Sequence, residues 1–204
     1  KSAGLVADYI AKLHVSDCIP LRSVEINDED KGLLLDQTTI RNLEISKTLS
    51  GDYEGTLIHS IDHVKTWMGR RLMRSWIMRP LRDVVIISKR QDAVSTLCKS
   101  SRKWKELRAT LTGLRDMERL AMQLTYGRVN GRDLIAISEC LEKMHHVEES
   151  MLGFENEMLN ELSHELTSID HIREIIQSAL FEQQPLSIKE GGMFKGTYNL
   201  ELDS

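Results

Sequence analysis

Residues 59–63 read HSIDH, which makes them the first candidate in this chain for metal chemistry. His59 and His63 are four residues apart, a spacing that places two imidazoles on one face of a helix, and Asp62 could add a carboxylate. The zinc-protease motif has a glutamate directly after its first histidine, whereas this chain has Ser60 there. A zinc site also needs further ligands that no nearby pattern supplies. We therefore favour a short helix with surface histidines, and a metal-dependent hydrolase remains the outside alternative.

Two further stretches could contact phosphate groups. The glycines of EGGMFKGT (190–197) invite a phosphate-loop interpretation, but Lys195 precedes Gly196 and reverses the order that such a loop requires. This excludes nucleotide binding by the stretch, although Lys195 could still contact a phosphate. Arg70 is a similar candidate, because it lies in an arginine-rich helix.

That helix belongs to a strongly basic segment. Residues 65–108 contain 13 Lys or Arg against three acidic residues, so they carry +10, while the remaining residues must carry −14 to give the net charge of −4. Such an asymmetry indicates either a polyanionic partner or pairing with the acidic part of the same chain. We favour internal pairing, because no interleaving of aromatic and basic residues suited to base stacking is present.

Composition places the chain among globular proteins. Its 204 residues are 41% hydrophobic and 28% charged, and no run approaches the ~20 apolar residues of a membrane helix. Cys18, Cys98 and Cys140 are far apart with no C-x-x-C pair, which favours buried thiols in a reducing compartment over disulfides or a zinc site. The first stretch lacks the features of a signal peptide, and it starts without Met, so we expect a piece of a longer protein.

The pattern predicts a mainly α-helical protein, because the three prolines stand where helices should start or stop. A small antiparallel β element is expected near the N-terminus, with residues 20–26 pairing with 33–36, and the tail from 187 reads as loop and strand. Helices are expected over residues 2–14, 39–45, 56–62, 66–78, 83–99, 101–111, 115–126, 131–150, 154–168 and 169–181.

Three blocks of sequence resemble the core or lever domain of the MutS family of DNA mismatch-recognition ATPases. They read LDQTTIRNLEI (35–45), GTLIHSIDHVKTWMGRRLMRSWIMRPLRD (55–83) and RQDAV (90–94). Weaker similarity continues through LRDMERLAMQL (114–124) and KEGGMFKGTYNLELDS (189–204). Ile61 and Val64 stand where the family usually has Leu and Thr, which leaves the charge pattern unchanged.

The resemblance implies a domain layout and a set of structural residues. Residues 1–188 would be the first half of a multihelical lever or core bundle, and residues 189–204 the truncated entry to the clamp domain. The motif positions that we expect to fix helices through buried or half-buried pairs, and so to couple sites, are Arg41, Asn42, Asp62, Arg71 and Arg74.

The implied function is DNA mismatch repair, with this region as the helical connector between DNA-binding domains and a C-terminal ATPase. No catalytic, cofactor or metal site is expected in this region; ATP and Mg would belong to the full-length protein. Expected partners are mismatched double-stranded DNA, a second MutS-type subunit in a homo- or heterodimer, and a downstream MutL-type protein, with no membrane. The location would be the bacterial cytoplasm at the nucleoid, or a eukaryotic nucleus. The alternative is a helical scaffold or interaction module in a recombination-type MutS relative.

The same layout predicts exposed apolar surface. Helices over residues 131–150 and 154–181 would lack the returning helices that complete the bundle in the family, so some of their apolar positions should be uncovered.

Overall fold

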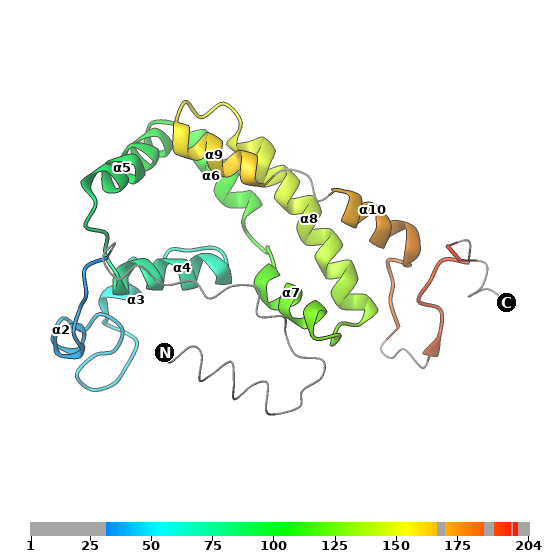
Figure 1. Ribbon diagram of the computed structural model, residues 1–204, viewed down its shortest axis with the longest axis horizontal. Helices are drawn as coiled ribbons and strands as arrows, with labels where there is room; N and C mark the ends of the chain where they lie inside the picture. The colour runs from blue at the N-terminus through cyan, green and yellow to red at the C-terminus, as the bar shows by residue number, and fades with distance from the viewer. Residues whose placement is uncertain (1–31, 167–169, 186–189, 197, 200–204) are drawn as a thin grey trace, which may run out of the picture. The chain divides into compact units, whose positions relative to one another are not determined.

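The computed structural model describes residues 32–166, 170–185, 190–196 and 198–199, and in this part the chain is built from helices and loops (Figure 1). Backbone contacts divide the chain into residues 1–31 and a unit that begins at Gly32. The helices are α2 (Gln37–Asn42), α3 (Leu57–Ile61), α4 (Trp67–Met78), α5 (Val84–Lys99), α6 (Ser101–Thr110), α7 (Met117–Thr125), α8 (Gly131–Met151), α9 (Glu157–Glu165) and α10 (Asp170–Ala179).

These bounds confirm the mainly helical prediction, and most helix starts follow from a capping side chain. The side chains of Thr56, Thr66 and Asp116 each accept a backbone N–H bond from the first turn of α3, α4 and α7. Asn130 and Asp133 form a reciprocal capping box at the start of α8. Such caps satisfy N–H groups that a helix leaves without a partner, and this makes helix starts readable from sequence.

The predicted strand over residues 33–36 is wrong. Leu33 N–H donates to Pro80 O over 2.7 Å, but only Gly32 and Leu81 form a bridge there, and it is isolated. The Asp36 side chain instead accepts the Thr39 N–H bond over 2.6 Å and starts α2. The other strand, over residues 20–26, lies outside the described residues, as does the helix over residues 2–14. The described tail likewise holds one isolated bridge, between Leu180 and Phe194.

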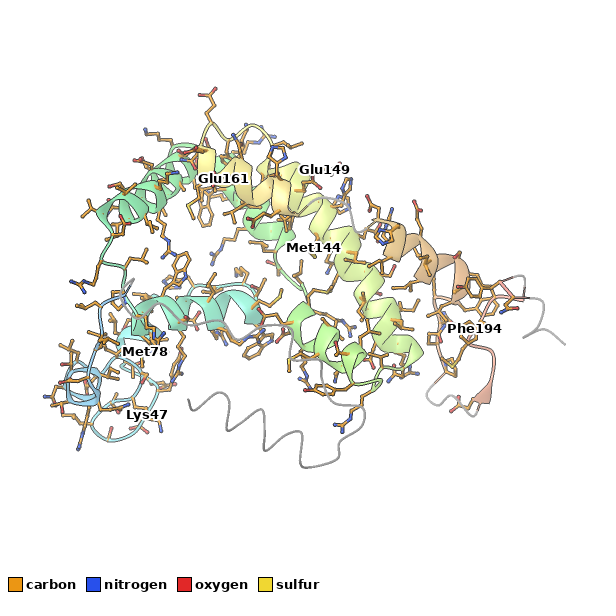
Figure 2. All side chains as sticks on the ribbon, in the orientation of Figure 1. Lys47, Met78, Met144, Glu149, Glu161 and Phe194 are labelled. Atoms are coloured by element: carbon orange, nitrogen blue, oxygen red, sulfur yellow. The ribbon has the colours of Figure 1, made fainter. Side chains whose placement is uncertain are left out.

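Residues 84–185, which we call the helical core, enclose two buried apolar clusters. Helix α8 packs against α6, α7, α9 and α10, and contributes to both clusters. The first cluster joins α7, α8 and α10, and Met144 of α8, labelled in Figure 2, packs against it. The second joins α5, α8 and the start of α9, with Phe154 only 3% exposed. Because both clusters share α8, the packing of this helix connects the two halves of the core.

Residues 32–83, which we call the N-terminal segment, bury far less. The buried hydrophobic residues of this segment are Ile45 and Ile58, and Thr56 beside them is fully buried. Backbone N–H groups of Leu57 and Ile58 donate to the carbonyls of Glu44 and Ile45, each over 3.1 Å. This segment is therefore held by local hydrogen bonds around a very small core.

Apolar side chains are exposed, but not mainly where the sequence analysis placed them. Helix α8, which was expected to be partly uncovered, has none of the large exposed hydrophobic residues, whereas α9 and α10 have Leu162, Ile172 and Ile175. More of the exposed apolar side chains lie on α4 and α5: Trp67, Leu72, Trp76, Val84, Val85, Ile86 and Val94. The difference arises because α6, α7, α9 and α10 surround α8, while α4 has no helix packed closely along it in the described part.

No helix within the described residues has the length and apolar character needed to cross a membrane.

Candidate functional site

Arg71 of α4 joins the N-terminal segment to the helical core. Its Nη1 and Nη2 donate to the two carboxylate oxygens of Asp116 over 2.6 and 2.8 Å, and its Nε donates to Glu118 over 3.1 Å. Nη2 also contacts the Glu118 carboxylate. The fork of donors on arginine matches a carboxylate in this bidentate way, which fixes the direction as well as the distance of the contact. Two elements 45 residues apart in sequence therefore meet at defined atoms.

The electrostatics of this contact follow from its geometry. The hydrogen bonds from Arg71 lower the pKa of the Asp116 carboxyl below its usual value, and the bond from Arg119 N–H adds to the effect. The same carboxylates raise the pKa of the Arg71 guanidinium further above its already high value. Both groups are thus charged at neutral pH. Asp116 serves two purposes, because the oxygen that accepts from Arg71 Nη2 also caps α7.

In the opposite direction, two arginines of the helical core reach the N-terminal segment. Nη2 of Arg108 on α6 donates to the backbone carbonyl of His63 over 2.7 Å. The guanidinium of Arg90 on α5 stacks over the Trp76 ring at 3.5 Å from the ring centroid, a favourable cation–π contact. The Arg90 Nε atom is buried and has no hydrogen-bond partner among the described residues. We call the three contacts of Arg71, Arg90 and Arg108 the arginine junction.

Asp62 anchors the neighbouring loop. Its side chain is 7% exposed and accepts Arg70 Nε over 2.8 Å, Tyr53 Oη over 3.3 Å and Val64 N–H over 3.3 Å. Asp62, Arg70 and Tyr53 line a hollow of about 540 Å³, and Arg74 lines it as well. Arg74 itself is exposed, and the part of the chain that the structure describes shows no ion pair for it.

The remaining predicted residues lie apart from this junction. Arg41 and Asn42 end α2 with exposed side chains that have no side-chain partner within the described ranges. Lys195 Nζ donates to the Gln177 carbonyl over 2.6 Å near the C-terminal end of α10, where a helix favours positive charge. The structure thus brings Arg71, Asp62 and Arg70 into ion pairs, whereas Arg41 and Arg74 form none among the described residues. The coupling roles expected of Arg41, Asn42, Asp62, Arg71 and Arg74 stay predictions, as do the phosphate contacts expected of Arg70 and Lys195.

The HSIDH stretch takes part in local packing. His59 Nδ1 accepts a 3.3 Å hydrogen bond from Gly55 N–H, and its ring lies edge-on to Tyr53 at 5.3 Å. Over the residues that the structure covers, no group of three His, Cys, Asp or Glu side chains is arranged to hold a metal ion. A metal-dependent hydrolase would need at least one more ligand arranged beside His59 and His63, and the described residues hold no such group of three.

Comparison with known proteins decides the family. Residues 38–204 match the family MutS domain III. The chain belongs to the MutS family.

Relatives align over nearly all of this MutS domain. The chain is 35% identical over 99% of its length to the DNA mismatch repair protein MutS of Methanosarcina barkeri. It is 34% identical over 96% of its length to the DNA mismatch repair protein MutS of Bacillus subtilis. The alignment covers 23% of each of these relatives, so the chain spans about a quarter of their length.

Sequence reasoning missed several residues of the arginine junction in this MutS domain. From the sequence, Asp116 and Glu118 appear only as part of the LRDMERLAMQL stretch, Arg90 as part of the RQDAV block, and Arg108 as a member of the basic segment. The charge asymmetry between residues 65–108 and the rest was the available signal, since it favoured internal pairing. It could not identify the partners, because the contacts join residues that are far apart in the chain.

Proposed function

We propose that this chain acts in DNA mismatch repair as the helical connector of a larger MutS-family protein. It would link DNA-binding clamp and mismatch-recognition domains to a C-terminal ATPase. The observation that carries the proposal is the match of residues 38–204 to MutS domain III. Relatives named DNA mismatch repair protein MutS support it over at least 96% of this chain. These names favour mismatch repair over a scaffold in a recombination-type relative.

The geometry suits a connector. Helix α8 has 21 residues and so spans roughly 30 Å. Its buried side chains lie along most of that length, from Ala136 to Met151. A helix packed on several sides at crystal-like density passes a displacement along its axis instead of absorbing it. This supports a mechanical role in which the helical core carries movement between distant domains.

The chemistry is proposed to reside elsewhere in the larger protein. ATP and Mg would bind the ATPase, mismatched double-stranded DNA the recognition and clamp domains, and residues 189–204 would lead into that clamp. A second MutS-type subunit and a MutL-type protein would be the protein partners, in the bacterial cytoplasm at the nucleoid or in a eukaryotic nucleus. This domain would contribute no catalytic group.

The test compares duplexes with the full-length protein that contains this chain. Fluorescence anisotropy should show tighter binding to a duplex with one G·T mismatch than to the matched duplex, and ATP with Mg should weaken the mismatch complex. Equal affinity for both duplexes would contradict the mismatch-repair proposal and favour the scaffold alternative.

A second measurement tests the connector role itself. Phe154→Ala should disturb the second apolar cluster and reduce the effect of ATP on mismatch binding, while Phe181→Ala, at a 45% exposed side chain, should leave it intact. A full ATP effect in a Phe154→Ala protein that is folded by circular dichroism would show that this domain does not transmit the signal.

A further inference from the structure

The two ends of the N-terminal segment lie next to each other. Gly32 at its start forms an antiparallel bridge with Leu81 at its end, and Leu33 N–H donates to Pro80 O over 2.7 Å. The chain therefore enters and leaves this segment at one place. Only the short link from Pro80 to Asp83 then leads into α5, whose first turn is capped by Asp83.

Apolar packing does not join this segment to the helical core. Neither buried apolar cluster of the described residues includes a side chain from residues 32–83. The close helix pairs in this part of the chain all lie among α5 to α10, and α2, α3 and α4 take part in none of them. Large apolar interfaces hold domains in one orientation, while small polar ones permit relative motion.

The arginine junction supplies polar and cation–π contacts between the two regions. Arg90 stacks on Trp76 close to the covalent link in sequence, whereas Arg71 and Arg108 reach across to α7 and to the loop before α4. The side chains of Arg71 and Glu118 are 49% and 66% exposed, so water and salt have access to this ion pair. Exposed ion pairs weaken when the Debye length becomes short.

We propose that the N-terminal segment turns against the helical core about the Pro80–Asp83 link, and that the ion pairs of Arg71 with Asp116 and Glu118 hold this joint closed. Arg71 is thus a positioning residue, and ionic strength sets the fraction of closed molecules. Glu118 adds to the bidentate pair with Asp116, so loss of either carboxylate loosens the joint without opening it fully. The inference does not depend on the proposed function in mismatch repair.

The test measures a distance across the joint by pulsed electron spin resonance in the 204-residue chain. Spin labels are placed on Ser75→Cys in α4 and Glu142→Cys in α8, both exposed positions. The native thiols are removed by Cys18→Ser, Cys98→Ser and Cys140→Ala. At about 0.01 M salt, where the Debye length is about 30 Å, one narrow distance distribution is expected, and at about 1 M salt, where it is about 3 Å, that narrow distribution should be lost.

Substitutions test whether the salt response arises from the ion pairs of Arg71 with Asp116 and Glu118. Arg71→Gln should lose the narrow distribution even at low salt, and Arg71→Lys, which keeps the charge without the fork, should lose part of it. Arg71→Glu combined with Glu118→Arg should recover more of it than Arg71→Glu alone. Arg102→Gln is the matched control, because Arg102 pairs with Glu106 within α6, and it should change nothing.

Circular dichroism verifies that each variant keeps its helices. A narrow distribution in Arg71→Gln at both salt concentrations would overturn the proposal, as would an unsubstituted joint that is already broad at low salt. If Arg71→Gln does not fold, Arg71→Lys and the charge exchange decide the question in the same way.

Discussion

The helical core and the N-terminal segment are both mostly helix and loop, but different forces hold them. In the helical core, α8 is surrounded and two apolar clusters are buried, with Ala136 of the first and Phe154 of the second only 1% and 3% exposed. In the N-terminal segment, α4 has no buried residue, and local hydrogen bonds surround Thr56 and Ile58. The comparison shows that helix content alone does not indicate stiffness, because apolar burial supplies most of the stabilising free energy of a fold.

The ion pairs within the helical core also differ in their surroundings from the ion pairs between the two regions. Within the helical core, side-chain ion pairs such as Arg102–Glu106 and Lys89–Glu157 lie on the surface and add to packing that already exists. Between the two regions, Arg71 and its carboxylates stand where neither buried apolar cluster of the described residues reaches. Similar surface ion pairs can therefore matter little in one place and decide the arrangement in another.

Phe154→Ala should give the largest effect, since it opens a cavity in the second apolar cluster of the helical core. Truncation of a buried phenylalanine costs about 3–5 kcal/mol, so the free energy of unfolding in urea should fall by that amount. Phe181→Ala, at a side chain that is 45% exposed, is the control and should cost little. Equal costs at the two positions would show that the cluster is not the main source of stability.

Ile58→Ala should give a large but confined effect. The side chain is 2% exposed, so its truncation should cost about 2–5 kcal/mol within the N-terminal segment. Hydrogen exchange followed by mass spectrometry should show faster exchange in α3 and unchanged protection in α8. The neighbouring Ile61→Ala is the control, since Ile61 is 45% exposed. Faster exchange throughout α8 would mean that the two regions unfold as one unit.

Loss of a helix cap should cost about the same in both regions. Thr66 caps α4 and Asn130 caps α8, each through a 3.0 Å bond to a backbone N–H group. Thr66→Ala and Asn130→Ala should each lower stability by about 1 kcal/mol, because capping is local to the first turn. Asn130→Asp keeps an acceptor and should restore most of the loss. A clearly larger cost at only one of these helices would point to tertiary contacts of that cap.

Lowering the pH should produce the smallest effect, and this effect should appear at the ion pair between Arg71 and Asp116. The pKa of Asp116 is lowered by Arg71, so its stabilising contribution is complete above the ordinary value of 3.8 and disappears as the pH falls through the lower value of the folded protein. The pKa of Asp36 is lowered as well, by its hydrogen bonds with Thr39, so the start of α2 should weaken in the same range. The spin-label distance across the joint should therefore broaden below about pH 4.

The Asp116→Asn variant distinguishes the acid response of Asp116 from that of Asp36. Asparagine still caps α7, but it lacks the charge that pairs with Arg71, so the joint should already be loosened at neutral pH. Its remaining response to acid should then be smaller than that of the unsubstituted chain, because Arg71 still pairs with Glu118. An unchanged acid response in Asp116→Asn would assign the effect to another group.

Much of the fold could be predicted from the sequence, because its determinants are local. Helical periodicity and the stop at Pro80 gave the predicted helices over residues 66–78 and 115–126, close to the observed Trp67–Met78 and Met117–Thr125. The strand prediction over residues 33–36 failed because a short run of apolar residues such as Leu33 to Leu35 does not distinguish strand from other structure, and Asp36 caps the following helix.

The sequence by itself thus determined where helices begin and end, which family the motifs resemble, and that the basic segment should pair internally. Only the tertiary structure decided that Arg71 meets Asp116 and Glu118, that α8 is enclosed while α4 is exposed, and that Arg41 and Asn42 lie outside the junction. The physical reason is range. Capping and helix periodicity act over three or four residues, whereas ion-pair partners and buried faces are chosen by packing between segments that the order of residues does not place together.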